Sequence, residues 1–282
     1  FNEHCIFLDQ KHIPMVINEQ TLINLVEIEK IFPHYFVGSN ADLPIVGGSM
    51  LAHEHYQGGR HTFPMMKAKI KKEVIFDKYP DVKVGIVDWP MSDLRLISKN
   101  SLTLISLGSK IIDFCDRYND QDRQITAFDG KTRRHTVTPI MHRDGEKFVL
   151  DLVLRDNNTS DKYPLGIFHP HSELWHIKKE NIGLIEVMGR AILPGRLKKE
   201  LEEVKKYLLD ENNEIAESHL AWAQEIKANH QITSENVDSI LQQALVEVFD
   251  QVLECAGVFK NNENGEAGWQ KFTEALVSEV DR

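Results

Sequence analysis

Two pairs of glycines enclose a row of histidines between residues 47 and 59, and this stretch constrains the fold more than any other. It reads Gly-Gly-Ser-Met-Leu-Ala-His-Glu-His-Tyr-Gln-Gly-Gly and follows an apolar run at 43–46. Alternate side chains of a strand point to the same face, so an extended backbone here places His53, His55 and Gln57 in one row. The flanking glycines have no Cβ to obstruct a bulky anion. The pattern predicts two imidazoles and an amide that are open to a ligand.

This row suits group transfer to and from phosphorus. A neutral imidazole is a nucleophile near pH 7 and also a good leaving group, so it can carry a phosphoryl or nucleotidyl group for part of a reaction. One histidine then attacks while its neighbours hold the phosphoryl oxygens. Two other interpretations stay open, namely a strand with polar surface histidines and a metal clip.

The residues around this row predict strands with one helix among them. The expected order is strand, helix, strand, strand and histidine row. The ranges are 3–8 for the first strand, 19–31 for an amphipathic helix, and 34–38 and 45–51 for the next two strands.

The following part of the chain repeats this order without clear residue identity, so we predict a degenerate duplication. After a lysine-rich linker at 60–72, the expected elements are strands at 82–87 and 94–97, a helix at 101–118, a hairpin of 136–141 with 148–154, and a strand at 165–168 that leads to His169 and His171.

The chain becomes helical from residue 179. Amphipathic helices are expected at 197–209, 213–230, 234–256 and 264–280. The predicted fold class is therefore α+β, with an antiparallel sheet followed by a helical C-terminal region. We divide the chain into a first half with the His-x-His motif (1–66), a second similar segment (67–194) and the helical region (195–282).

The charge is unevenly distributed. The formal net charge is −10, yet residues from Gly195 onward hold 9 Lys+Arg against 18 Asp+Glu. Residues 1–194 are nearly neutral and have no basic stripe, which argues against nucleic acid and favours a nucleotide-sized partner. No apolar run approaches the roughly 18 residues of a membrane helix. Three cysteines lie far apart without a Cys-x-x-Cys pair, which is typical of thiols in a reducing cytoplasm.

Two blocks of sequence resemble a known family. The first is Phe-Pro-His-Tyr-Phe-Val-Gly-Ser-Asn-Ala-Asp-Leu-Pro-Ile-Val-Gly-Gly-Ser at 32–49 with the histidine row at 53–59. The second is Pro-Leu-Gly-Ile-Phe-His-Pro-His at 164–171 with 176–189. Together they resemble class II galactose-1-phosphate uridylyltransferases, bacterial enzymes of the histidine-triad superfamily. This implies a sheet of histidine-triad type. Relatives carry a long segment before the position of Phe1, so we expect a C-terminal fragment.

The resemblance implies a chemistry for the histidine row. The second histidine of the motif, here His55, attacks the α-phosphorus of UDP-glucose and releases glucose 1-phosphate. Galactose 1-phosphate then takes the uridylyl group from the imidazole and becomes UDP-galactose. Gln57 matches the glutamine that donates its amide to a nonbridging oxygen, and His53 is an orienting group or a metal ligand.

The resemblance also implies further site residues. Ser49 and Gly48 are expected at the phosphates, Asn40 and Asp42 at the nucleotide, and Lys179 and Glu186 at the distal phosphate and the sugar hydroxyls. The chemistry requires no cofactor. A divalent zinc or iron ion is a further expectation, with His12, His53, His169 and His171 as candidate ligands, although the cysteine pair that completes the zinc site in the better known class is absent from this chain.

The resemblance leaves two alternatives for the activity. A histidine-triad hydrolase or phosphorylase would pass the nucleotidyl group to water or phosphate, and a truncated domain would have no activity. For the transferase we expect UDP-glucose and galactose 1-phosphate as partners, a cytoplasmic homodimer, and neither nucleic acid nor membrane as a partner.

Overall fold

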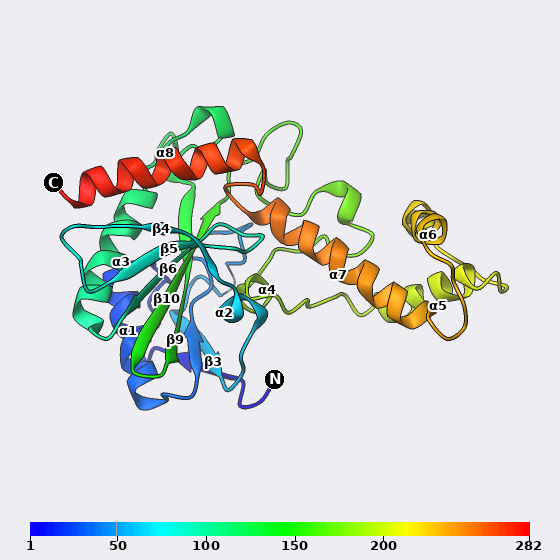
Figure 1. The fold of residues 1–282 in the computed structure, drawn as a ribbon, viewed down its shortest axis with the longest axis horizontal. Helices are drawn as coiled ribbons and strands as arrows, with labels where there is room; N and C mark the ends of the chain where they lie inside the picture. The colour runs from blue at the N-terminus through cyan, green and yellow to red at the C-terminus, as the bar shows by residue number, and fades with distance from the viewer. Residues whose placement is uncertain (49) are drawn as a thin grey trace. The chain divides into compact units, whose positions relative to one another are not determined.

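The structure is a computed structural model that describes residues 1–48 and 50–282. An eight-stranded sheet in the order β1-β3-β2-β9-β10-β6-β5-β4 dominates it, and all seven pairings are antiparallel (Figure 1). The predicted α+β class is confirmed. The chain forms two compact units, which are described separately. The first comprises Phe1–His169, Asn181–Arg190 and Glu254–Arg282, and the second comprises Pro170–Glu180 and Ala191–Leu253.

The strands of the large sheet belong to the first unit. They are β1 (Cys5–Leu8), β2 (Phe36–Gly38), β3 (His55–Gly59), β4 (Ile70–Val74), β5 (Lys83–Val87), β6 (Asp93–Ser98), β9 (His135–Asp144) and β10 (Lys147–Asp156). A separate small ribbon pairs β7 (Phe128–Asp129) with β8 (Thr132–Arg133).

Helices are found in both units. Those of the first are α1 (Glu19–Ile31), α2 (Pro64–Lys67), α3 (Ser101–Cys115), α4 (Leu184–Val187) and α8 (Glu263–Val280). The second unit contains α5 (Leu197–Leu208), α6 (Glu217–Asn229) and nearly all of α7 (Val237–Ala256). Two short 3-10 turns lie at Gln121–Arg123 and Ser172–Leu174.

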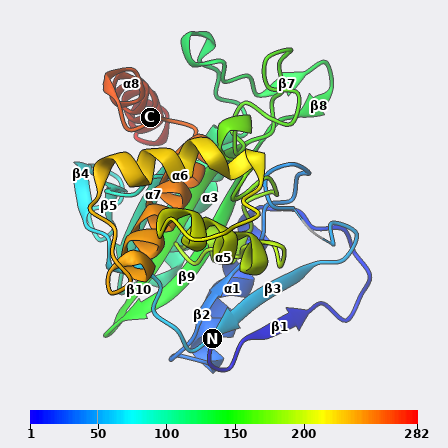
Figure 2. The same ribbon diagram turned by 90° about the vertical axis from the view of Figure 1, so that its right-hand side faces the viewer.

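The predicted duplication is visible in the topology. Both β1-α1-β2-β3 and β6-α3-β9-β10 have the order strand, helix, strand, strand, with the small ribbon β7–β8 inserted between α3 and β9 in the second set. In the sheet, the first set lies in the order β1-β3-β2 and the second in the matching order β6-β10-β9. The two sets meet where β2 pairs with β9, while β1 forms one edge of the sheet and β4 the other (Figure 2).

One face of the sheet forms the hydrophobic core with α1 and α3. A row of directly paired residues crosses six strands on this face, and all are buried in one cluster: Val37, Met141, Leu150, Leu96, Val84 and Val74. Leu22 of α1 and Leu104 of α3 join the same cluster. Burial of this alternating row explains why the register is fixed.

The opposite face carries the residues of interest. Gly38 of β2 pairs with Gln57 of β3, and directly opposed residues share a face. A Cβ on Gly38 would lie 2.8 Å from Leu184 Cδ1, so the missing side chain makes room for α4. Helix α4 therefore packs on the face that carries His55 and Gln57.

Three predictions of local structure are wrong. Of the predicted strand at 45–51, residues 45–48 and 50–51 form no strand and lie in turns, a bend and irregular chain, because Ile45 (φ 75°) and Gly47 (φ 82°) adopt the left-handed conformation. Residues 165–168 also form no strand, since Gly166 has φ 131°. The expected linker at 60–72 contains α2, with Pro64 at its first turn, and the start of β4.

The second unit has a small core of its own. Val204 and Leu208 of α5, Ala223 of α6 and Leu241 of α7 are buried together. The division at residues 66 and 194 stays a prediction. Across residues 1–48 and 50–282, no helix is both long and apolar enough to span a membrane.

Candidate functional site

His55 is the first residue of β3, and a backbone contact fixes its tautomer. Its Nδ1 lies 2.9 Å from the carbonyl oxygen of His53. A carbonyl only accepts hydrogen bonds, so Nδ1 carries the proton and Nε2 carries the lone pair. No described residue forms a hydrogen bond with Nε2. The imidazole is thus held in the tautomer that a nucleophile at Nε2 needs.

His55 is less accessible than expected. Only 2% of the residue is exposed, so the prediction of an unhindered ring is not met. Neighbouring chain covers most of the residue, yet Nε2 is not among the fully buried polar atoms without a partner.

His53 lies outside the predicted row. Its backbone N–H donates to the Met50 carbonyl (3.0 Å), and Met50 has φ 50°, so the chain turns here and β3 begins only at His55. The His53 ring donates through Nε2 to the carbonyl oxygen of Asp9 (2.8 Å). Its contribution to His55 is therefore the backbone carbonyl and not the imidazole.

Gln57 shares the face of His55 and has a free donor. Its Oε1 accepts a hydrogen bond from His4 Nε2 at 3.2 Å. With the carbonyl occupied, the amide NH2 points its two hydrogens elsewhere. This arrangement leaves a neutral donor two residues from the nucleophile candidate.

Asn40 and Glu186 both accept hydrogen bonds from the backbone at the start of α4. Asn40 Oδ1 accepts from the backbone N–H of Leu184 (3.1 Å), and Glu186 Oε2 accepts from that of Gly183 (3.2 Å). Continuing the β2–β3 register by two residues places Asn40 opposite His55. The structure thus brings Asn40 and α4 to the strand end where His55 lies.

The glycine pair before the histidines packs tightly against protein. A Cβ on Gly47 would lie 2.3 Å from the Ile182 carbonyl oxygen, and one on Gly48 would lie 2.2 Å from that of Leu43. Both glycines are therefore required by close backbone contacts. Ser49 lies outside the described residues.

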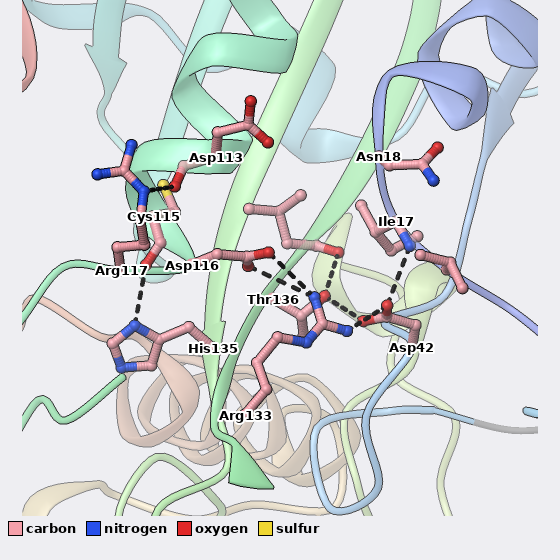
Figure 3. Close-up of polar contacts among 12 residues, drawn as sticks. Ile17, Asn18, Asp42, Asp113, Cys115, Asp116, Arg117, Arg133, His135 and Thr136 are labelled. Carbon is pink, nitrogen blue, oxygen red and sulfur yellow. Dashed lines mark hydrogen bonds and ion pairs between the residues drawn. The ribbon is translucent and has the colours of Figure 1, made fainter. Parts of the chain in front are cut away.

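Asp42 forms the centre of a buried polar network (Figure 3). Its carboxylate accepts from the Ile17 backbone N–H (3.0 Å), from Thr136 Oγ1 (2.5 Å) and from the Arg133 guanidinium. Arg133 also pairs with Asp116 at 3.3 Å. Asp42 thus ties the loop after β2 to β9, and its contact with a nucleotide stays a prediction.

The predicted metal ligands form one close pair. The ring centroids of His12 and His53 lie 4.0 Å apart. In the part of the chain that the structure describes, no three His, Cys, Asp or Glu side chains gather in a metal-binding group. A zinc site normally has four protein ligands, or three plus water, so the described residues do not complete one.

The remaining predicted residues lie in different units. His169 is in the first unit and its Nε2 lies 3.1 Å from Asn181 Oδ1. His171 and Lys179 are in the second unit, where Lys179 Nζ lies 4.7 Å from the centroid of the Trp175 ring. Their roles as ligands stay predictions.

Sequence analysis missed Arg155, at the end of β10. Its guanidinium donates to the Ile182 carbonyl oxygen (2.8 Å) and to Thr138 Oγ1 (3.3 Å). Burial lowers the pKa of Arg155 to about 10, and the charge of Glu186 acts against this shift. The alternation of side chains along the strand could have indicated it. Asp151, Val153 and Arg155 share one face of a strand that is otherwise apolar.

Comparison with known proteins finds the same family that the sequence blocks around the histidines resemble. The family model for the galactose-1-phosphate uridyl transferase C-terminal domain matches residues 27–224. A galactose-1-phosphate uridylyltransferase of Lactobacillus helveticus is 76% identical over 99% of this chain and 57% of its own length. Relatives of the same name from Pediococcus pentosaceus and Streptococcus mutans are 58% and 53% identical over 98% of the chain. The chain spans little more than half the length of these relatives.

Proposed function

The chain belongs to the family of the galactose-1-phosphate uridyl transferase C-terminal domain, and from this premise we propose that it carries the nucleotidyl-transfer centre of such an enzyme. The lone pair on His55 Nε2 attacks the α-phosphorus of UDP-glucose. A nitrogen–phosphorus bond forms, the bond to the bridging oxygen breaks, and glucose 1-phosphate leaves. A phosphate oxygen of galactose 1-phosphate then displaces the imidazole, which gives UDP-galactose.

The observation that carries this proposal is the fixed tautomer of His55. Attack at phosphorus needs an unprotonated ring nitrogen, and the bond from Nδ1 to the His53 carbonyl supplies it without a separate base. The same bond strengthens as the uridylyl-imidazole becomes cationic, since an imidazolium is a better donor than imidazole.

Gln57 supports the same step. Charge on the nonbridging oxygens needs donors placed before the reaction. The Gln57 amide remains available because its carbonyl is held by His4. An amide is a neutral donor, so it adds no counter-charge of its own and the site needs a cation elsewhere.

Exchange between the two sugar phosphates tests this proposal. We expect His55→Ala and His55→Gln to abolish formation of UDP-galactose while circular dichroism stays unchanged. His230→Ala, an exposed histidine after α6, is the control and should leave the rate unchanged. Full exchange by either His55 variant would contradict the assignment.

Acceptor dependence separates transfer from hydrolysis. After the first turnover, release of glucose 1-phosphate from UDP-glucose should require galactose 1-phosphate. Sustained release without the acceptor would identify a hydrolase instead.

The proposal also covers the substrates, the oligomeric state and the location of the enzyme. We propose that its substrates are UDP-glucose and galactose 1-phosphate, that it acts as a homodimer in the cytoplasm, and that its chemistry requires no metal. A structural divalent ion at His12 and His53 would need ligands beyond the described residues.

A further inference from the structure

Arg155 is a buried cation without a counter-ion. Only 2% of the residue is exposed, and its hydrogen bonds go to a hydroxyl and a backbone carbonyl. Among the described residues, no carboxylate forms an ion pair with it, and its Nε has no partner. Buried charges in proteins are normally paired. Arg95, on the same sheet, follows that rule through Asp151 at 2.6 Å.

The carboxylates around Arg155 have other partners. Glu186 of α4 accepts from the Gly183 backbone, and its charge reaches Arg155 only at longer range. Asp156 of β10 accepts from Asn158 and lies 3.0 Å from His135 Nε2. Asp42 binds Ile17, Thr136 and Arg133. Among the described residues, no carboxylate therefore forms an ion pair with Arg155, and only the charge of Glu186 acts on it from a greater distance.

The position of this charge relates it to the predicted phosphate site. Arg155 binds the Ile182 carbonyl oxygen at 2.8 Å. The same oxygen would lie 2.3 Å from a Cβ on Gly47, so the glycine loop rests directly on Ile182. The guanidinium thus lies beneath the loop that leads into His53 and His55.

We propose that Arg155 is the buried counter-charge for the diphosphate of the nucleotide substrate. An anion bound on the loop of Gly47 and Gly48 would provide the missing counter-charge for Arg155. The guanidinium would attract this anion across a single layer of backbone. Little water separates the two charges, so screening is weak. Arg155 does not touch the reacting atoms and is a positioning residue. This inference rests on the proposed function and adds a cation to it.

Nucleotide binding by charge variants tests the inference. The affinities of UDP, UMP and uridine are measured by calorimetry, or by competition for the weakest ligand. Arg155→Met removes the charge, and we expect it to weaken UDP about 10- to 100-fold while uridine changes less than about threefold. UMP should fall between them. Lys99→Met, which removes an exposed cation that pairs with Glu146, is the control for net charge.

A lysine at this position gives a second readout. Burial lowers the pKa of a lysine far more easily than that of an arginine. Arg155→Lys should therefore bind UDP well near pH 7 and lose affinity as the pH rises to about 9. The wild-type protein is measured over the same range as the control, because ionisation of the terminal phosphate and of the uracil ring affects UDP equally in both experiments. The loss that belongs to the lysine is the difference between the two profiles.

The outcomes separate this inference from the proposed function. Equal weakening of UDP and uridine in Arg155→Met would mean that Arg155 only supports the fold, and unchanged UDP affinity would also overturn the inference. Absence of UDP binding by the wild-type protein would do the same. If Arg155→Met does not fold, the pH profile of Arg155→Lys decides. Detection of a uridylyl group on His55 in the wild-type protein would support the proposed transferase function even if the inference about Arg155 fails.

Discussion

At the scale of single residues, His55 and Gln57 of β3 contribute to the proposed reaction in different ways. His55 owes its reactive tautomer to a backbone carbonyl, which no substitution of the His53 side chain removes. Gln57 contributes through its side chain. We therefore expect His53→Ala to be tolerated better than a change at Gln57.

Gln57→Ala should slow exchange about 100-fold through kcat, because it removes one preorganised donor to the phosphoryl oxygens. KM for UDP-glucose should change little. Steady-state kinetics under saturating substrate measure this, with His4→Ala as the control that frees the Gln57 carbonyl without removing the amide. A kcat within threefold of wild type would show that the amide faces away from the phosphate.

Asp93 should make stability depend on pH. It is fully buried, and both carboxylate oxygens lack partners among the described residues. Burial raises the pKa of Asp93 well above 3.8, and the charge of Asp151 adds to the effect. Between the unfolded and native pKa values, the native state holds one more proton, so stability falls as the pH rises.

Asp93→Asn removes this dependence. Relative to wild type, the free energy of unfolding of the variant should rise by up to about 1.4 kcal/mol for each pH unit above about 4. The rise should stop at the pKa of Asp93 in the native state. Urea titrations at several pH values measure the difference, with the exposed Asp129→Asn as the control. Parallel pH profiles of the two proteins would show that Asp93 is ionised when folded.

The residue patterns predicted part of this site. His-x-His-x-Gln between glycines predicted that His55 and Gln57 share a face, and this is confirmed because period two holds once the strand begins. It failed for His53, since the left-handed Met50 and the turn it makes are not encoded by the polar pattern. Arg155 was missed because its lack of a partner depends on tertiary neighbours.

At the scale of elements, the loop before β3 depends on Gly47. The residue has φ 82°, and a Cβ would lie 2.3 Å from the Ile182 carbonyl oxygen. Gly47→Ala should destabilise the protein by about 2–4 kcal/mol, because backbone strain and a steric clash add together.

Gly130 provides a matched control for this prediction. It has φ 60° in the turn between β7 and β8, and apart from its two chain neighbours no described residue comes within 4 Å of the position that a Cβ would occupy. Gly130→Ala should therefore show only the cost of the backbone conformation, about 1 kcal/mol. Chemical denaturation of both variants measures the difference. Equal losses would mean that the loop moves away from Ile182 without penalty.

Elements with strong local signals were predicted well. The helix expected at 19–31 is α1 at Glu19–Ile31, with Asn18 and Thr21 forming its capping box. The hairpin across Asp144 and Gly145 is β9–β10. The strand expected at 45–51 failed because an apolar run alone does not distinguish a strand from a buried turn.

At the scale of the whole molecule, duplication explains six of the eight strands of the sheet, and β5 and β4 extend it at one edge. Each half supplies three strands and one helix in the same order, and their junction at β2 and β9 makes one continuous core. The order of elements predicted this repeat, whereas the sheet order did not follow from sequence because the pairing of β2 with β9 is a long-range contact.

The packing of the C-terminal helices could not be predicted from their sequence patterns. They were expected as one helical region, yet α8 packs in the sheet unit, where Phe272 contacts Phe114 of α3 at a ring-centroid distance of 5.3 Å. Amphipathic spacing gives the buried stripe of a helix but not its partner. Helices α5 and α6 instead form the core of the second unit.

The most direct test of the central claim is a map of the covalent intermediate. The protein is incubated with UDP-glucose without an acceptor, quenched under conditions that preserve phosphoramidates, digested and analysed by mass spectrometry. We predict one uridylyl group on the peptide from β3, located on His55 and removed by galactose 1-phosphate. A uridylyl group on another residue, or none while exchange proceeds, would contradict the account.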